Sequence, residues 1–263
     1  MRILVTNDDG TASPGLWALA AALAEVGEVV VVAPFRDMSG SSTATMLARP
    51  ARLRQIRPSR RLAGVAAYSV TAPPASCVLL ALRGAISGGR VDFVASGVNS
   101  GANLGRDALL SGTVGAAFIA AMEGVPALAV SIAKNAERTW DWTSASAVAA
   151  RLARRLHDEP LREGLLLNLN LPSVPGPEMA GVRLTHLSRE CCLTRLSVQP
   201  HESRPATFRF LTERLVPRGE DTGSDEWAIA NDFVSLTPLS PDVGCVTDDG
   251  LLAGWLSDLL PRR

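Results

Sequence analysis

The chain has 263 residues and a mass of 27.7 kDa, close to the upper limit of what one hydrophobic core usually serves, so we expect one domain with appendages. Its 26 basic and 26 acidic side chains cancel, which removes the positive field needed to bind polymeric nucleic acid or an anionic membrane surface. No run approaches the ~18 apolar residues of a membrane span, and the apolar start is too short for a secretory signal. We therefore expect a soluble cytoplasmic protein.

Strands and helices are predicted to alternate through residue 172. Short apolar runs predict strands over residues 2–6, 28–33, 65–70, 91–96, 128–132 and 165–167. Apolar residues at helical spacing predict helices over residues 14–26, 76–86, 114–123 and 144–156, the first with Ser13 as N-cap and Pro14 at its first position. Such alternation is typical of a parallel sheet with helices on both faces. We therefore predict an α/β fold with a three-layer, Rossmann-like parallel sheet.

The pattern changes after Pro172, where prolines recur and residues 190–225 lack a helical period. Extended arms or hairpins are expected there, followed by a strand over residues 233–236 and a closing helix over residues 249–260. The chain is accordingly divided into an α/β core (1–172), an irregular arm and hairpin region (173–240) and a C-terminal helical region (241–263). Because the arms look too irregular to pack only on their own core, we expect the chain to form a homodimer or homotetramer.

Three oxygen-rich loops follow predicted strands, at residues 7–10, 36–42 and 97–103. In an open parallel sheet, ligands bind beyond the carboxyl ends of the strands, where the strand order reverses. The adjacent carboxylates of Asp8 and Asp9 repel each other unless a cation or hydrogen-bond donors neutralise them. Oxygen donors without a histidine or thiolate cluster favour Mg²⁺ or Mn²⁺ over zinc. The alternative is that Asp8 or Asp9 only caps the helix near Pro14 or orders the turn.

The segment Ser111-Gly112-Thr113 precedes a predicted apolar helix, so its free amides could bind a phosphate; the alternative is a plain N-cap. The chain has no P-loop and no G-x-S-x-G motif, and Asn7 stands where an aspartyl-nucleophile phosphatase needs Asp. The remaining candidates are interpreted as structural or solvent-exposed: the four cysteines as reduced thiols, His157, His186 and His201 as surface or structural residues, Trp140 and Trp142 as packing residues, and the arginine run of residues 49–61 as a solvated face.

Four segments, residues 3–10, 32–40, 96–105 and 111–114, closely resemble the SurE survival-protein family in sequence and order. The resemblance implies a SurE-like fold and a metal-dependent, acid phosphatase-like 5'/3'-nucleotidase. By the same resemblance, the metal-ligand positions are Asp8, Asp9, Ser39 and Asn99, and the phosphate-site positions are Asn7, Gly40, Asn103, Ser111, Gly112 and Thr113. The chain departs from the family at residues 72–77, where it lacks an expected carboxylate, at Arg106, where an acidic residue is common, and in the arm, which lacks tyrosines.

We therefore predict a phosphatase in which one divalent ion, Mg²⁺ or Mn²⁺, binds the phosphate of a nucleoside monophosphate and activates water, with Asp8 or Asp9 as the base. Two alternatives stay open. The substrate could be another small phosphomonoester, such as a sugar phosphate or a biosynthetic intermediate. The protein could also be a non-catalytic module that binds a nucleotide or phosphate.

Overall fold

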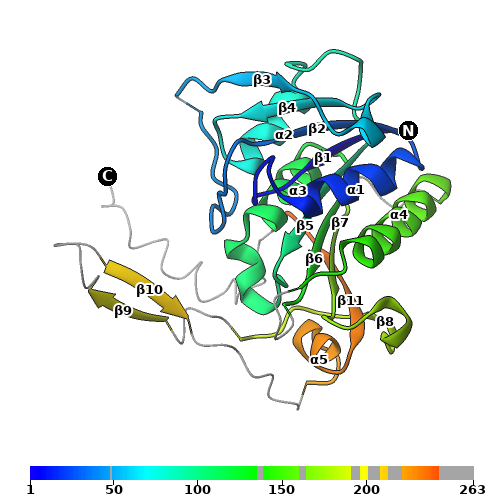
Figure 1. Ribbon diagram of the computed structural model, residues 1–263. Helices are drawn as coiled ribbons and strands as arrows, with labels where there is room; N and C mark the ends of the chain where they lie inside the picture. Colours follow the sequence, from blue (N-terminus) through cyan, green and yellow to red (C-terminus); the bar gives the residue numbers. More distant parts are fainter. Residues whose placement is uncertain are drawn as a thin grey trace, which may run out of the picture.

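The computed structural model describes residues 1–47, 49–134, 139–159, 164–190, 196–200, 208–212 and 221–242 (Figure 1). Its strands are β1 (Arg2–Thr6), β2 (Glu28–Pro34), β3 (Leu53–Ile56), β4 (Ala66–Val70), β5 (Phe93–Ser100), β6 (Ala127–Ile132), β7 (Leu166–Leu171), β8 (Gly181–Leu184), β9 (Leu196–Pro200), β10 (Phe208–Thr212) and β11 (Phe233–Leu239). Its helices are α1 (Pro14–Ala24), α2 (Pro74–Leu82), α3 (Gly112–Met122), α4 (Trp142–Asp158) and α5 (Asp225–Ala230), with short 3-10 helices η1 (Arg60–Leu62), η2 (Gly105–Leu110) and η3 (Gly176–Glu178).

A nine-stranded sheet in the order β3-β4-β2-β1-β5-β6-β7-β11-β8 forms the centre of the molecule. The strands from β4 to β7 are parallel, whereas β3 is antiparallel to β4 and β11 is antiparallel to β7. The chain builds outward from β1 through β2 to β4 and then returns to place β5 on the other side of β1. The strand order therefore reverses at β1 and β5, and a ligand crevice is expected beyond their carboxyl ends.

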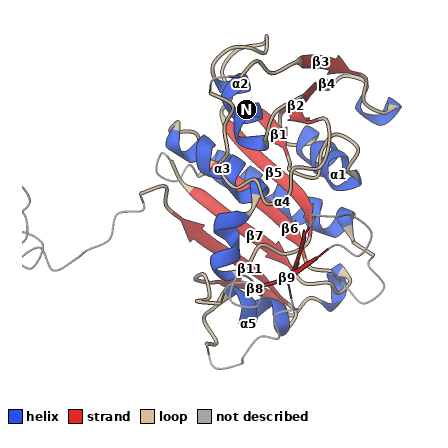
Figure 2. Cartoon of the chain, turned by 90° about the vertical axis from the view of Figure 1, so that its left-hand side faces the viewer, coloured by secondary structure: helices blue, strands red, loops and turns tan. Residues whose placement is uncertain are grey.

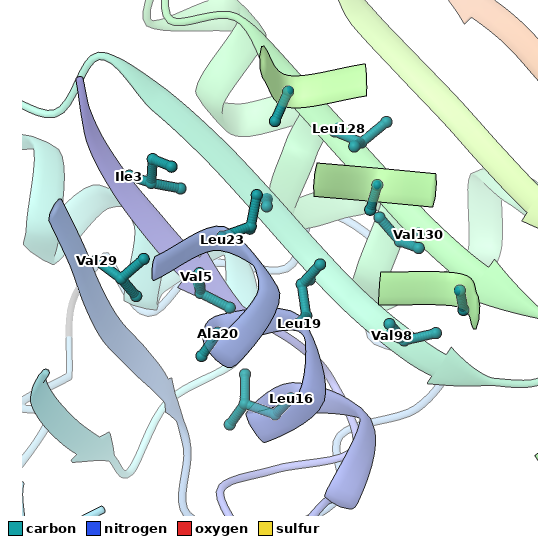
Figure 3. Close-up of a cluster of buried hydrophobic side chains, with 14 of the residues drawn as sticks. Ile3, Val5, Leu16, Leu19, Ala20, Leu23, Val29, Val98, Leu128 and Val130 are labelled. Carbon is teal, nitrogen blue, oxygen red and sulfur yellow. The ribbon is translucent and has the colours of Figure 1, made fainter. Parts of the chain in front are cut away.

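Alternation along the buried strands divides the core into two apolar clusters, one on each face of the sheet. Ile3 and Val5 face the cluster covered by α1 and α4, whereas Leu4 faces the cluster covered by α2 and α3. Figure 3 shows how Leu16, Leu19 and Leu23 of α1 meet the first cluster, and Figure 2 shows helices on both sides of the sheet. Each fully buried aliphatic side chain contributes about 1.5–3 kcal/mol, so both faces are strongly held.

The predicted three-layer α/β fold is confirmed, but the sheet is mixed rather than wholly parallel. Three described elements, β3, β8 and α5, were not expected. The side chains of β3 and β8 are exposed or only half-buried, so neither strand has an apolar run to reveal it, and β3 lies inside the arginine run interpreted as a solvated face. Helix α5 has six residues, too few to show a helical period.

Strands β9 and β10 pair only with each other, in the region where arms or hairpins were expected, and lie apart from the large sheet (Figure 1). The predicted helix over residues 249–260 lies outside the described residues, and the homodimer or homotetramer stays a prediction. In the described part of the chain, no helix is long and apolar enough to cross a membrane. Cys77 is a buried free thiol, and the other three cysteines lie outside the described ranges.

Two of the expected packing residues behave as predicted. The rings of Trp140 and Trp142 stack with their centroids 5.4 Å apart, and both pack against the cluster under α1 and α4. His186 lies on the surface, where its Nε2 is 2.8 Å from the Asp221 carboxylate. None of these residues contacts Asp8 or Asp9 in the described structure. The candidate functional residues are therefore those that follow the strand ends.

Candidate active site

The candidate site lies where β1 and β5 end side by side. Thr6 pairs with Ser96, so the loop that follows β1 leaves the sheet next to the last residues of β5. The β5–β6 register shifts between Ser96 and Asn99, where Gly97 has a φ of +138°. A Cβ on Gly97 would lie 2.2 Å from the Val130 carbonyl oxygen, so only glycine fits there. This irregularity brings Asn99 and Ser100 to the sheet edge, beside the loop of Asp8 and Asp9.

Asp8 is 3 % exposed and points to the start of α3. Its Oδ2 accepts a hydrogen bond of 3.0 Å from the Thr113 amide, and its Oδ1 accepts one from the Thr113 hydroxyl. Burial raises the pKa of Asp8; the Thr113 hydroxyl lowers it, and the neighbouring Asp9 raises it again. The net effect is a raised pKa, so this carboxylate lacks enough donors to compensate for its burial.

Asp9 turns the opposite way, to the end of β5. Its two carboxylate oxygens accept hydrogen bonds of 3.2 Å from the amide and the hydroxyl of Ser100. Burial is again the largest influence and raises its pKa, the Ser100 bonds lower it, Asp37 raises it and Lys134 lowers it. The two adjacent aspartates are therefore fixed by different elements, and both keep a raised pKa.

The loop after β2 brings Ser39 to the same edge. The Met38 amide donates to the Asp8 carbonyl at 2.8 Å, while the Ser39 amide and hydroxyl donate to Asp37 Oδ1 at 2.7 and 2.6 Å. Further along the loop, Ser42 donates through its amide to Leu110 and through its hydroxyl to Leu109. The loop is thus anchored at both ends, to the aspartate turn and to η2.

Two glycines of α3 allow this loop to approach the helix. A Cβ on Gly112 would lie 2.6 Å from the Ser41 hydroxyl and 2.8 Å from the Asp8 Cβ. A Cβ on Gly115, one turn later, would lie 2.0 Å from the Ser42 carbonyl oxygen. Side chains at either position would push the Ser39 loop away from the aspartates. Small residues at this helix face are therefore part of how the site is assembled.

Asparagines order the turns around the carboxylates. Asn99 Nδ2 donates to the Gly101 carbonyl at 2.7 Å, which leaves its Oδ1 without a hydrogen bond in the described structure. Asn7 and Gly10 exchange hydrogen bonds of 3.1 and 3.2 Å, so Asn7 orders the aspartate turn. The side-chain Nδ2 of Asn103 donates to the Ser131 hydroxyl at 2.8 Å, and its backbone amide donates to Asn170 Oδ1 at 2.8 Å.

The start of α3 combines a cap with one free donor. Ser111 occupies the N-cap position, and its hydroxyl accepts from the Val114 amide at 3.2 Å. The Thr113 amide is taken by Asp8. The amides of Gly112 and Gly40 make no hydrogen bond within the described part of the chain. The plain N-cap geometry at Ser111 therefore coexists with donors that could face an anion.

The structure brings most of the predicted residues to one edge of the sheet. Asp8 contacts Thr113, and Asp9 contacts the residue next to Asn99. Ser39 instead bonds to Asp37, and no hydrogen bond among the described residues joins Ser39 or Asn99 to either aspartate of the pair. Those residues also contain no group of three or more His, Cys, Asp or Glu side chains suited to a metal. A cation here would depend on two carboxylates and neutral oxygens.

Several residues that position this site were not predicted as site residues from the sequence. Ser100 holds Asp9, Asp37 holds Ser39, and the buried pair Asn168 and Asn170 of β7 donates to the Asn103 carbonyl at 2.9 and 3.2 Å. The signal in the sequence was the alternation of asparagine with leucine in a strand whose residues are all buried. Buried amides need partners, so such a pair indicates a polar structure above the strand.

These features define an α/β protein with two neighbouring carboxylates at the switch point of its sheet. A family model described as "Survival protein SurE" matches residues 3–193. A "5'-nucleotidase SurE" of Dehalococcoides mccartyi (strain CBDB1) is 38% identical over 239 residues, which cover 91% of this chain and 88% of that protein. A "5'/3'-nucleotidase SurE" of Edwardsiella ictaluri (strain 93-146) is 41% identical over 257 residues, 97% of this chain and 96% of that one.

A solved structure shows the same likeness in three dimensions. The crystal structure of the SurE protein from Aquifex aeolicus matches with a TM-score of 0.78 and 30% sequence identity, covering 98% of this chain and 100% of that one. The chain therefore belongs to the SurE family. The resemblance read from four short segments in the sequence is confirmed over most of the chain.

Proposed function

We propose that this protein is a divalent-metal-dependent phosphomonoesterase that hydrolyses nucleoside monophosphates to nucleoside and phosphate. The observation that carries the proposal is the pair Asp8 and Asp9, two neighbouring carboxylates with raised pKa values at the switch-point crevice of a SurE-family chain. Relatives named 5'-nucleotidase or 5'/3'-nucleotidase support the nucleotide as the substrate class.

The donor chemistry fits a hard divalent cation. Asp8 and Asp9 offer carboxylate oxygens, Asn99 offers an amide oxygen without another partner, and Ser39 offers a hydroxyl oxygen whose proton is directed to Asp37. Oxygen donors of this kind suit Mg²⁺ or Mn²⁺. The raised pKa values of the two aspartates also fit, since a pair left unneutralised in a buried edge is unfavourable and a cation relieves that cost.

Each group of residues has a role in the proposed hydrolysis. When bound, a divalent ion offsets the phosphate charge and lowers the pKa of water. Thr113 and Ser100 hold the two aspartates in fixed orientations, and Asp8 or Asp9 takes the proton of the attacking water. The free amide of Gly112 at the start of α3 and that of Gly40 in the loop after β2 donate to phosphate oxygens.

Asn7, Asn103 and Ser111, the remaining predicted phosphate-site residues, keep the surrounding turns in place through the hydrogen bonds described above. Fixed turns allow the donors to meet the transition state without reorganisation, which is where electrostatic catalysis gains most. The reaction type depends on these ordered turns, whereas the choice of leaving group depends on residues farther out, including the positions where the chain departs from the family pattern.

The proposal is tested by phosphate release from a panel containing nucleoside 5'- and 3'-monophosphates, a sugar phosphate and an aryl phosphate. We expect release from nucleoside monophosphates with Mg²⁺ or Mn²⁺, loss of release with a chelator and recovery when the metal is restored. A nucleotidase is excluded if another metabolite is strongly preferred and nucleotides are no better than the aryl phosphate. Stoichiometric nucleotide binding without release at any metal concentration would identify a binding module instead.

A further inference from the structure

Lys134 follows β6 and lies across the turn that ends β5. It is the only lysine in the chain, and it is exposed. An ideal Cβ placed on Gly101 would lie 3.3 Å from Lys134 Cε and 3.8 Å from its Nζ. The Gly101 carbonyl accepts a hydrogen bond from the Asn99 side chain, and the amide of the preceding residue, Ser100, donates to the Asp9 carboxylate. The ammonium group therefore sits at the rim of the candidate active site.

The backbone that leads into Lys134 is held by the two strands beside β6. Ile132 pairs with Ser100 of β5 and with Leu171 of β7, and the Ala133 amide donates to the Leu171 carbonyl at 2.9 Å. Lys134 is the next residue, two positions beyond the end of a buried strand. Its place beside Gly101 thus follows from the sheet, and only its flexible stem remains to move.

The Lys134 ammonium group lies beside Gly101 and forms no ion pair there with a described residue. Within the described ranges, no carboxylate lies within ion-pair distance of its Nζ. Asp9 is held by Ser100, the residue before Gly101, so the Lys134 charge lies on the same side of the site as this carboxylate. Asp8, Asp9 and Asp37 place three carboxylates at the same edge, and these repel an incoming phosphate. A cation at the rim offsets part of that repulsion.

We propose that the Lys134 ammonium binds a phosphoryl oxygen of the substrate at the rim of the crevice; this inference rests on the phosphatase function proposed above. A lysine suits the task because it presents a point charge with three donors on a flexible stem, and it can follow a phosphate that changes geometry during the reaction. Lys134 is thus a substrate-binding residue that the family motifs quoted above do not include.

The single lysine makes a direct binding experiment possible. The whole protein is acetylated with an amine-selective reagent in the presence of Mg²⁺ or Mn²⁺, and modification of Lys134 and of the Met1 amino group is followed by mass spectrometry. Inorganic phosphate should slow acetylation of Lys134 several-fold and leave Met1 unaffected, with chloride at equal ionic strength as the control. Equal rates at Lys134 with saturating phosphate and with chloride would overturn the inference.

A kinetic experiment separates binding from a merely structural role. With a nucleoside monophosphate, Lys134→Ala should raise KM about tenfold, equivalent to about 1.4 kcal/mol, with little change in kcat. Lys134→Arg should restore most of the affinity because it keeps the charge. Arg90→Ala is the matched control. Arg90 is an exposed cation that precedes β5, so it lies near the amino end of that strand, whereas the site lies at its carboxyl end; its loss should leave KM unchanged.

The two experiments keep this inference distinct from the proposed function. If the wild-type protein releases no phosphate but phosphate still protects Lys134, the phosphatase proposal fails and the anion site stands. If the protein is an active phosphatase, yet Lys134 is not protected and Lys134→Ala leaves KM unchanged, the phosphatase stands and the role of Lys134 is refuted. A fall in kcat at constant KM would also refute it, because binding would then not depend on the ammonium group.

Discussion

Two regions of this molecule bury an aspartate at the start of a helix, and they treat it differently. Asp225 of α5 is 0% exposed, and its carboxylate accepts amide hydrogen bonds of 2.8, 2.9 and 2.9 Å from Gly105, Ser188 and Glu226. Asp8, buried to a similar extent, accepts only the two donors of Thr113 and stands beside a second carboxylate. The pKa of both carboxyls is raised, but Asp225 accepts from the amides of three different residues, whereas Asp8 accepts from one residue and adjoins a second carboxylate.

Asp225 is a carboxylate held by backbone amides, whereas Asp8 belongs to the proposed active site. For both residues burial is the largest influence and raises the pKa; backbone hydrogen bonds are the next largest influences on Asp225 and lower its pKa, whereas the Asp9 charge adds to the rise at Asp8. The Asp225 carboxylate accepts hydrogen bonds from the amides of Gly105 in η2 and of Ser188 after β8. It therefore connects these two segments to α5. Buried charge without enough donors is instead what a cation site requires.

The largest effect should follow replacement of Asp8 by asparagine. We expect Asp8→Asn to reduce kcat about a thousandfold, because it removes a carboxylate proposed to hold the divalent ion or to take the proton of the attacking water. The free energy of unfolding without added metal should stay near the wild-type value, since the substitution also removes the repulsion between Asp8 and Asp9. Steady-state phosphate release and denaturant unfolding measure the two quantities. Turnover within tenfold of wild type would remove Asp8 from the proposed site.

The opposite result is expected for Asp225. Asp225→Ala leaves three buried amides without acceptors, and we expect the free energy of unfolding to fall by about 3 kcal/mol. Turnover of the folded fraction should stay close to wild type, because Asp225 does not contact the crevice carboxylates. Urea unfolding monitored by circular dichroism, with phosphate release measured below the transition, tests both parts. A large loss of kcat with unchanged stability would show that the comparison assigns the two aspartates wrongly.

Most of the fold could be predicted because its central strands and helices are buried on defined faces. Runs such as Val29 to Val32 and the leucines of α1 show their burial directly in the sequence. The elements that were missed, β3, β8 and α5, are exposed at edges or very short, and their formation depends on pairing with distant partners such as β4 and β11. Local sequence does not carry that information.

The site could be predicted as a set of loops but not as a set of contacts. The sequence places Asp8 and Asp9 after β1 and glycines before α3, which is enough to expect one edge of the sheet. It does not reveal that Thr113 donates to Asp8, or that Ser100 donates to Asp9, because these hydrogen bonds join residues far apart in the chain. The alternative of a helix cap was close to the observed geometry, but for the wrong helix: Asp8 accepts from α3 rather than α1.

A third aspartate also accepts a hydrogen bond from an amide at the start of a helix, but it is only partly buried. Asp141 is the N-cap of α4, and its Oδ1 accepts from the Ser144 amide at 2.9 Å. Hydrogen bonding with Ser144 is the largest influence and lowers the pKa of Asp141 from the ordinary 3.8. Asp8 and Asp141 thus both accept from an amide in the first turn of a helix, and their pKa values are shifted in opposite directions. Burial, rather than the helix terminus, decides the sign.

The smallest expected effect follows from that sign. Because the folded state lowers the pKa of Asp141, its ionised cap contributes stability above pH 3.8, the unfolded value, and loses it as the pH falls through the folded value. Asp141→Ala should therefore lower the free energy of unfolding by about 1 kcal/mol at neutral pH, and the difference from wild type should shrink in acid. Asp141→Asn, which can still accept a hydrogen bond but does not ionise, should cost less and show little pH dependence. Denaturant unfolding at a series of pH values measures these differences, and a stability gap that widens as the pH falls would reverse the assignment.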